Sequence, residues 1–180
     1  MVPFKVVLSL LAVSAAVAAP TQSLTVLCYQ DITDIDTNVR KLIKIAGAYH
    51  GGLVAFLPEI PFALQAAAAT ASGGLHSSLL PKTLPLDNLF RLAEHVNKTL
   101  AVDNPIVVEK FIEKKDQYER SGLRATVHSN LKLFLDLHLR FANNILDRVP
   151  DDAPADRIAV AKADIDAITV ALQKGVMAFE

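Results

Sequence analysis

The side chains able to do chemistry are few in this chain, and the first of them is its single cysteine, Cys28. One cysteine excludes an intramolecular disulfide framework and a zinc site built from cysteines. Cys28 precedes Ile32 and Ile35 at helical spacing, so we interpret it as a small buried hydrophobic residue. The alternative is a reactive thiol, which would favour a neighbouring positive charge, and none flanks Cys28.

The acidic pairs and the known catalytic motifs give no indication of an enzyme. Asp34 and Asp36, like Asp164 and Asp166, are two positions apart. Residues at this spacing do not share a face of a helix, so the pairs suit neither metal binding nor acid–base catalysis. The sequence contains no G-x-S-x-G, H-E-x-x-H, P-loop or dinucleotide-binding motif. We therefore expect a protein that is not an enzyme and that uses no cofactor and no metal; a hydrolase ranks last among the alternatives.

The polar residue that most suggests a binding role is His138, which lies within the apolar run LKLFLDLHLRF at 131–141. This run alternates like a strand, but at 100° per residue its apolar residues and those up to Leu146 fall in one arc of about 200°. We therefore predict an inner helix with a wide apolar face, on which Leu133 is the misfit. Two interpretations of His138 stay open: a core histidine with satisfied hydrogen bonds, or a contact for the polar head group of a ligand.

The composition is that of a globular protein. The chain has 180 residues, of which 52% are hydrophobic and 21% charged, which excludes a disordered polar chain and suits one domain. Its net charge of −1 provides no basic footprint for nucleic acid. Trp is absent and aromatic residues make up only 6%, so the core has to be aliphatic.

The first 18 residues have the layout of a secretory signal peptide. Lys5 precedes an apolar run over 6–13, and Ala16-Val17-Ala18 supplies the small residues of a cleavage site. The run is too short for a membrane anchor, which needs about 20 apolar residues. We place the cut after Ala18, and we expect one secreted, soluble domain over 19–180 with no later transmembrane segment.

The rest of the chain shows apolar residues at helical spacing in successive segments. We predict helices over 28–46, from 85 to 100, from Asn104-Pro105 to a turn at Gly122, over 123–149, and from Pro154 to the C-terminus. A further, less regular helix over 63–71 would be stopped by Gly73-Gly74. Five or six helices joined by short loops predict an all-α fold, an antiparallel bundle.

The segment 51–86 differs from the rest because only Glu59 and Lys82 are charged in it. Four prolines interrupt it, so it can expose apolar area without unfolding a bundle. We predict that it adsorbs to apolar surfaces or gates the bundle, with Phe56 and Phe62 as the adsorbing residues. Separately, Asn97 begins an Asn-Lys-Thr sequon and is the predicted site of N-glycosylation.

The sequence resembles the fungal hydrophobic surface-binding protein A family, which overlaps the cell-wall galactomannoproteins. The resemblance lies in Ile32-Thr33-Asp34-Ile35-Asp36-Thr37, in the Tyr49-His50-Gly51-Gly52 break, in the stretch from Lys114-Lys115-Asp116 to Ser121-Gly122-Leu123, and in the Met177-Ala178-Phe179 ending. It implies a secreted helical protein that adsorbs to hydrophobic surfaces, recruits polyester-degrading hydrolases and binds fatty acids inside the bundle. The 51–86 segment departs from the family pattern through its low charge, and no ligand-binding residue is carried over.

The leading hypothesis is therefore non-catalytic binding of apolar material, either a surface or an amphiphile such as a fatty acid. The Gly122 turn would fold the apolar faces on either side of it together, and they would line a channel for an acyl chain with His138 as the polar group. The predicted lining residues are Leu42, Phe90, Phe111, Leu131, Phe134, Leu135 and Ile145. The alternatives are an ordinary core and a glycosylated structural or interaction protein of the fungal cell wall.

Overall fold

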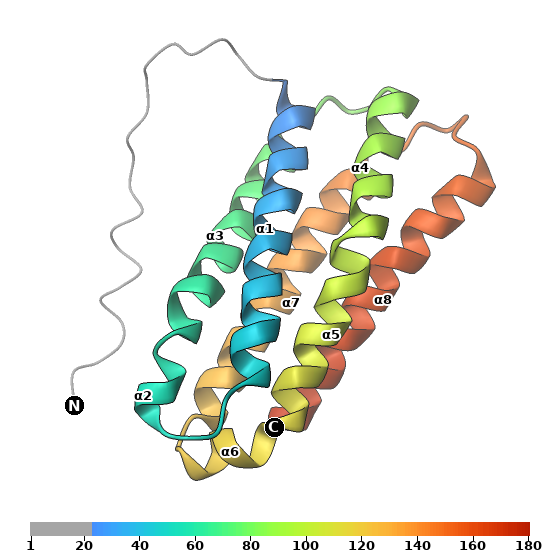
Figure 1. Ribbon diagram of the computed structural model, residues 1–180. Helices are drawn as coiled ribbons and strands as arrows, with labels where there is room; N and C mark the ends of the chain where they lie inside the picture. The colour runs from blue at the N-terminus through green and yellow to red at the C-terminus, as the bar shows by residue number, and fades with distance from the viewer. Residues whose placement is uncertain (1–22) are drawn as a thin grey trace, which may run out of the picture.

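The computed structural model describes residues 23–180, which fold into helices and turns with no strand (Figure 1). The predicted signal peptide, residues 1–18, lies outside the described residues. The helices are α1 (Leu24–Gly47), α2 (Leu53–Phe56), α3 (Glu59–Ser78), α4 (Leu86–Lys98), α5 (Leu100–Glu113), α6 (Lys115–Arg120), α7 (Arg124–Leu146) and α8 (Ala155–Phe179). The predicted all-α antiparallel bundle is confirmed.

The long helices form a ring of five columns, namely α1, α2–α3, α4–α5, α7 and α8 (Figure 1). Contacts run from α3 to α1, from α1 to α4 and α5, from these to α8, from α8 to α7, and from α7 back to α3. No column occupies the centre of such a ring, so side chains from all five have to fill it. The short helix α6 closes one end of the bundle, where it links α5 to α7 and contacts both.

The apolar stripe predicted for the first helix is buried along α1. Ser23 begins the helix as its N-cap, because its hydroxyl accepts a hydrogen bond from the Val26 amide at 3.3 Å. Cys28 is fully buried, and burial raises the pKa of its thiol to about 12. A thiol that stays protonated is a poor nucleophile, so the interpretation of Cys28 as a core residue is confirmed.

The helix α7 is less deeply placed than predicted. Leu131 and Phe141 are buried in the core, but Phe134 and Leu135 are only half-buried. The prediction that this is an inner helix is wrong, because a ring of columns has no inner position. The apolar face of α7, roughly 200° wide, therefore extends past the two helices that it packs against. Leu133, the predicted misfit, is exposed to 47%.

Two predicted helix boundaries are also wrong. α3 runs through Gly73-Gly74 without a break. The ring of Phe141 packs on Gly73 so closely that a Cβ there would lie 2.4 Å from the ring carbon Cε1. Gly73 therefore serves helix packing, and neither glycine ends the helix. α5 begins at Leu100 and carries Pro105 inside it; the break falls at Thr99, whose φ of −128° and ψ of −89° separate α4 from α5.

The segment Leu53–Ser78, which comprises α2 and α3, is long and apolar enough to cross a membrane by length and composition alone, since an 18-residue window within it has a mean hydropathy of 1.4. This differs from the expectation that no later segment reaches that threshold. In the bundle, α3 packs against α1 and α7.

A buried polar cluster fastens the α6 end of the bundle. The Tyr118 hydroxyl donates to the Glu59 carboxyl group, with distances of 2.9 and 3.0 Å to its two oxygens, and its ring stacks on Tyr49 at 4.3 Å. The Tyr49 hydroxyl donates to Ser121 Oγ at 2.9 Å. Burial raises the pKa of Glu59 to about 7, against the opposing effect of the Tyr118 hydrogen bond.

The two adjacent glycines of α3 allow a matched test of helix packing. Gly74→Ala should stabilise the protein by up to about 1 kcal/mol, because alanine is the better helix former and its Cβ would lie 3.8 Å from Arg140. Gly73→Ala should destabilise it instead, since overpacking against Phe141 costs about 1–3 kcal/mol. Urea unfolding measures both changes; equal stabilisation by the two substitutions would contradict the close approach of α3 to α7.

The Glu59 carboxyl predicts a pH dependence of stability. Its folded pKa of about 7 lies above the ordinary 4.5, so its contribution is fully present below pH 4.5 and is lost as the pH rises through 7. Glu59→Gln keeps an acceptor for Tyr118 and removes the titration. Between pH 5 and 8 the wild type should lose stability relative to this variant, on the order of 3 kcal/mol. Parallel stability curves for the two proteins would refute the raised pKa of Glu59. Asp36 also titrates in this range, because burial raises its pKa to about 6. Its contribution is the same in both proteins, so it cancels in the difference.

Candidate ligand-binding site

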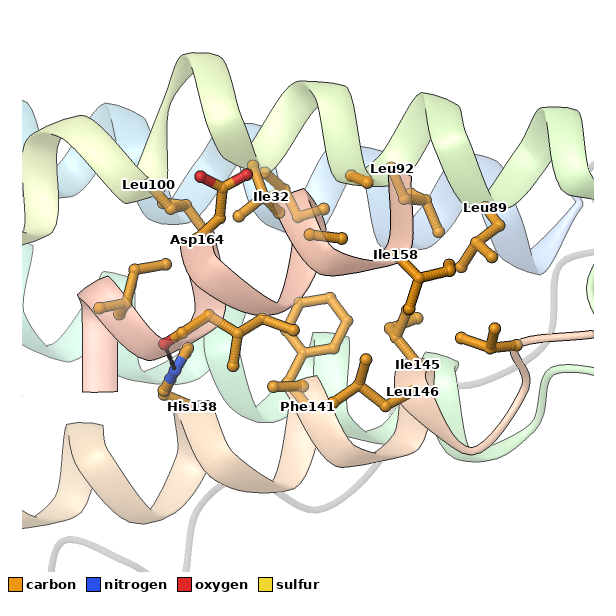
Figure 2. Close-up of a pocket in the computed structure, with 17 residues that line it drawn as sticks. Ile32, Leu89, Leu92, Leu100, His138, Phe141, Ile145, Leu146, Ile158 and Asp164 are labelled. Carbon is orange, nitrogen blue, oxygen red and sulfur yellow. Dashed lines mark hydrogen bonds between the residues drawn. The ribbon is translucent and has the colours of Figure 1, made fainter. Parts of the chain in front are cut away.

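An apolar cavity of about 80 Å³ lies between α4, α7 and α8, and Ile32 of α1 and Leu100 of α5 also line it (Figure 2). Its walls are almost entirely aliphatic. The lining residues are Ile32, Leu89, Leu92, Ala93, Val96, Leu100, His138, Phe141, Ala142, Ile145, Leu146, Val149, Ile158, Ala161, Asp164, Ile165 and Ile168.

Helical periodicity positions these walls. On α8 the lining residues Ile158, Ala161, Ile165 and Ile168 follow steps of three and four, so they share one face. The corresponding stripe on α4 is Leu89, Leu92, Ala93 and Val96, and α7 supplies the third wall. Since α4 and α8 belong to neighbouring columns, their two stripes face the same interior space across from α7.

Two polar side chains, His138 and Asp164, line the cavity, and Figure 2 shows them toward the same end of it. The His138 Nε2 atom lies 3.3 Å from the Ile165 carbonyl oxygen and 3.0 Å from Thr169 Oγ1. Thr169 Oγ1 also donates to the Ile165 carbonyl at 2.8 Å. Burial lowers the pKa of His138, because the charged imidazolium is disfavoured away from water. The imidazole is therefore neutral at neutral pH.

A polar contact joins α4 to α8 beside the cavity. The Asn97 side-chain amide on α4 lies 2.9 and 3.0 Å from the two carboxylate oxygens of Asp164 on α8 and donates to that carboxylate. A second link between these helices is the Arg157 guanidinium, 3.7 Å from the centre of the Phe90 ring. Asn97 is exposed, and its glycosylation stays a prediction.

The structure brings together two of the eight predicted lining residues, His138 and Ile145. The other predicted lining residues are Leu42, Phe90, Phe111, Leu131, Phe134 and Leu135; these pack elsewhere, and Leu42 and Leu131 are buried in the core. The channel was predicted between α5 and α7, whereas the cavity lies between α4, α7 and α8, because α8 packs against both α5 and α7. The missed residues belong to stripes visible in the sequence, but periodicity does not tell which stripes meet.

The predicted adsorbing residues are also corrected. Phe56 is buried and packs edge-on against Tyr118, with ring centres 6.2 Å apart, so it is a core residue and not an exposed adsorbing one. Phe62 is half-buried, with the Lys41 ammonium 5.0 Å from its ring centre. The exposed apolar residues of this segment are aliphatic, for example Leu57 and Leu64.

No group of three or more His, Cys, Asp or Glu side chains within the described residues 23–180 is arranged to hold a metal ion. The spacing argument against Asp34 with Asp36 agrees with their burial, since Asp36 is buried and Asp34 is exposed.

Solved structures with the same fold come from fungal ligand-binding proteins. Ligand-binding domain 1 of the Penicillium marneffei MP1 protein, complexed with arachidonic acids, superposes with a TM-score of 0.75 at 22% identity, covering 87% of this chain and 99% of that one. Afmp4p in complex with palmitic acid gives a TM-score of 0.77 at 15% identity, with the same coverage of 87% and 99%. Domain 2 of the MP1 protein gives 0.74 at 19% identity, covering 89% of this chain and 98% of that one. No curated protein matches the sequence.

The family comparison covers most of the bundle. The model of the family described as hydrophobic surface binding protein A matches residues 27–147, which extend from the first turn of α1 to the end of α7. The resemblance in sequence, the match and the shared fold agree. This chain belongs to the hydrophobic surface-binding protein A family.

Proposed function

We propose that this protein is a secreted, non-catalytic carrier that binds the acyl chain of a fatty acid between α4, α7 and α8. The observation that carries the proposal is the cavity itself, whose walls are apolar except for His138 and Asp164. Ligand sites of this kind are mostly apolar, with a few polar groups that fix orientation. The structural neighbours with arachidonic and palmitic acid support the same class of ligand.

The size of the cavity requires the bundle to open on binding. A cavity of about 80 Å³ is smaller than the roughly 150 Å³ that accommodates a single benzene ring. A long acyl chain therefore has to displace a wall. The helix α4 is suited to move, because Thr99 already interrupts the helix between α4 and α5 and the Asn97–Asp164 contact that joins α4 to α8 is exposed.

His138 can receive the carboxylate of the ligand without loss to the fold. Thr169 donates to the Ile165 carbonyl on its own, so that carbonyl stays paired when the imidazole turns away from it. A carboxylate beside the buried imidazole would favour its charged form. The proposal therefore places the head group at the His138 end and the acyl chain along Ile145 and Ile158.

Three parts of the proposal have separate support. Secretion depends on the predicted signal peptide, and glycosylation on the Asn97 sequon. Recruitment of a secreted hydrolase to an apolar substrate is implied only by the family resemblance. The alternative, a glycosylated structural protein of the cell wall, would need no cavity.

A filled cavity should abolish ligand binding. Palmitate should stabilise the delipidated protein in proportion to ln(1 + [L]/Kd), which is about 2.7 kcal/mol of unfolding free energy at 100 times Kd. The measured result is a rise in melting temperature. Ala161 lines the cavity and Ala163 is exposed on the same helix, so Ala161→Phe should lose the shift and Ala163→Phe should keep it. Circular dichroism checks that both variants are folded. Equal shifts in the two variants would place the ligand elsewhere.

The head-group position predicts a change in the titration of His138. In the delipidated protein its NMR titration midpoint should lie below the value of about 6.5 for a free histidine, because burial lowers its pKa. Palmitate should raise that midpoint through the added carboxylate. A His138 midpoint that does not respond, in a protein that palmitate still stabilises, would put the carboxylate at the other end.

A further inference from the structure

The helix α3 has its small residues inside and its large apolar residues outside. Its buried positions carry small or polar side chains, namely Glu59, Ala66, Thr70, Gly73, Gly74 and Ser77. An ordinary surface helix has the opposite arrangement, with the large apolar residues facing the core. The exposed residues of α3 therefore require an explanation that the packing of the bundle does not supply.

The exposed apolar residues form one continuous stripe, which we call the outer stripe of α3. It consists of Leu57, Ile60, Leu64, Ala68, Ala71, Leu75 and Leu79, at successive steps of 3, 4, 4, 3, 4 and 4. The large members are exposed to 57% at Leu57, 38% at Ile60, 58% at Leu64, 54% at Leu75 and 60% at Leu79. At 100° per residue the stripe fits within an arc of about 100°, and at 1.5 Å per residue it is about 33 Å long.

The outer stripe carries no charge along this length. Between Leu53 and Pro81 the only Asp, Glu, Lys or Arg is Glu59, which is buried. His76 of the same helix pairs with Asp31 of α1 at 2.7 Å. Basic side chains instead lie along the two flanks of α3. Lys41 of α1 sits over the Phe62 ring, and the side chain of Arg140 on α7 lies beside Gly74.

We infer that the outer stripe of α3 is a membrane-docking surface, which inserts among the acyl chains of a phospholipid bilayer with the helix parallel to the bilayer plane. Helices that lie in this interface bury an apolar face and place Lys and Arg toward the polar side, at the level of the phosphates. Lys41 and Arg140, one on each neighbouring helix, occupy that level. The outer stripe is also longer than a small ligand, and a continuous surface such as a bilayer can cover its whole length.

A protein partner fits this surface less well. Interface hot spots are enriched in Trp, Tyr and Arg, with Leu under-represented, whereas the outer stripe is made of Leu, Ile and Ala. A second copy of the chain would bring two uncharged stripes together, and light scattering would detect the resulting dimer.

The docking surface lies one helix away from the cavity. Gly73 on the inner side of α3 contacts the ring of Phe141, and the same ring lines the cavity (Figure 2). This link rests on the proposed function, because it makes the bilayer the source of the fatty acid. Docking itself does not depend on the cavity, so the two proposals can fail separately.

Flotation with small vesicles of phosphatidylcholine tests the docking surface. The wild type should float with the vesicles. Leu64→Ser with Leu75→Ser should reduce the bound fraction about tenfold or more, since two inserted side chains become polar. Val160→Ser with Val170→Ser is the matched control on α8, because these residues are exposed to 57% and 62%, and it should float like the wild type. The stripe variant should keep the palmitate-induced rise in melting temperature, which separates loss of docking from loss of the cavity site.

Several results would overturn the inference. A wild type that stays with the soluble fraction, or a stripe variant that floats like the wild type, excludes this surface. A dimer seen by light scattering in the wild type and absent in the stripe variant would assign the stripe to a second copy of the chain. Lys41→Gln with Arg140→Gln should weaken vesicle binding without changing retention on an octyl resin; unchanged vesicle binding would remove the assignment to phospholipid.

Discussion

The ring of Phe141 packs directly on the backbone of α3 at Gly73, where a Cβ would lie 2.4 Å from the ring carbon Cε1. This contact requires small residues on the inner face of α3, and it lets α3 and α7 approach closely. It also directs the large residues of α3 outward and holds an aromatic ring at the wall of the cavity. The Asn144 amide adds to the same contact by donating to the Gly74 carbonyl at 2.9 Å. The outer stripe and the cavity wall thus both follow from one helix–helix contact.

A ring of five columns has a packing problem that a four-helix bundle does not have. Its centre is wider, and a chain without tryptophan and with 6% aromatic residues has few side chains large enough to fill it. Protein interiors are normally packed to the density of organic crystals, and each unfilled volume loses dispersion contacts. The tyrosines and phenylalanines around Tyr118 fill the α6 end. The other end relies on Leu, Ile and Ala, and the cavity lies there.

The sequence predicted the helices well where one apolar stripe faces the core. The stripes of α1 and α8 and the start of α4 after Pro85 were all predicted within a few residues. Gly73-Gly74 was misinterpreted because a glycine pair that ends a helix and one that admits a neighbouring ring look identical in a single sequence. Asn104-Pro105 was misinterpreted as a start for a similar reason: the Asn104 side chain donates to the Leu100 carbonyl within the helix and does not cap it.

The site was predicted less completely, for a different physical reason. Periodicity gives the direction of a side chain around its own helix, so it placed His138 and Ile145 on the interior face of α7. It does not give the neighbour that the face meets, and Leu135, a few residues earlier on α7, is half-buried outside the cavity. The order of columns around the ring is a tertiary property, set here by which helices carry residues small enough for close contact.

The arrangement separates two apolar features that would otherwise compete. A concave apolar surface can exclude water around one acyl chain, whereas an exposed apolar stripe has to be covered by a larger partner such as a bilayer. In this protein α7 stands between them, with α3 on one side and α8 on the other. Apolar area that stays exposed gains none of the roughly 25 cal/mol per Å² that burial provides, so the large leucines on the outside of α3 add little to the stability of the bundle. If both proposals hold, a bilayer that covers the outer stripe would supply that free energy, and it would hold the cavity next to the phase in which an acyl ligand dissolves.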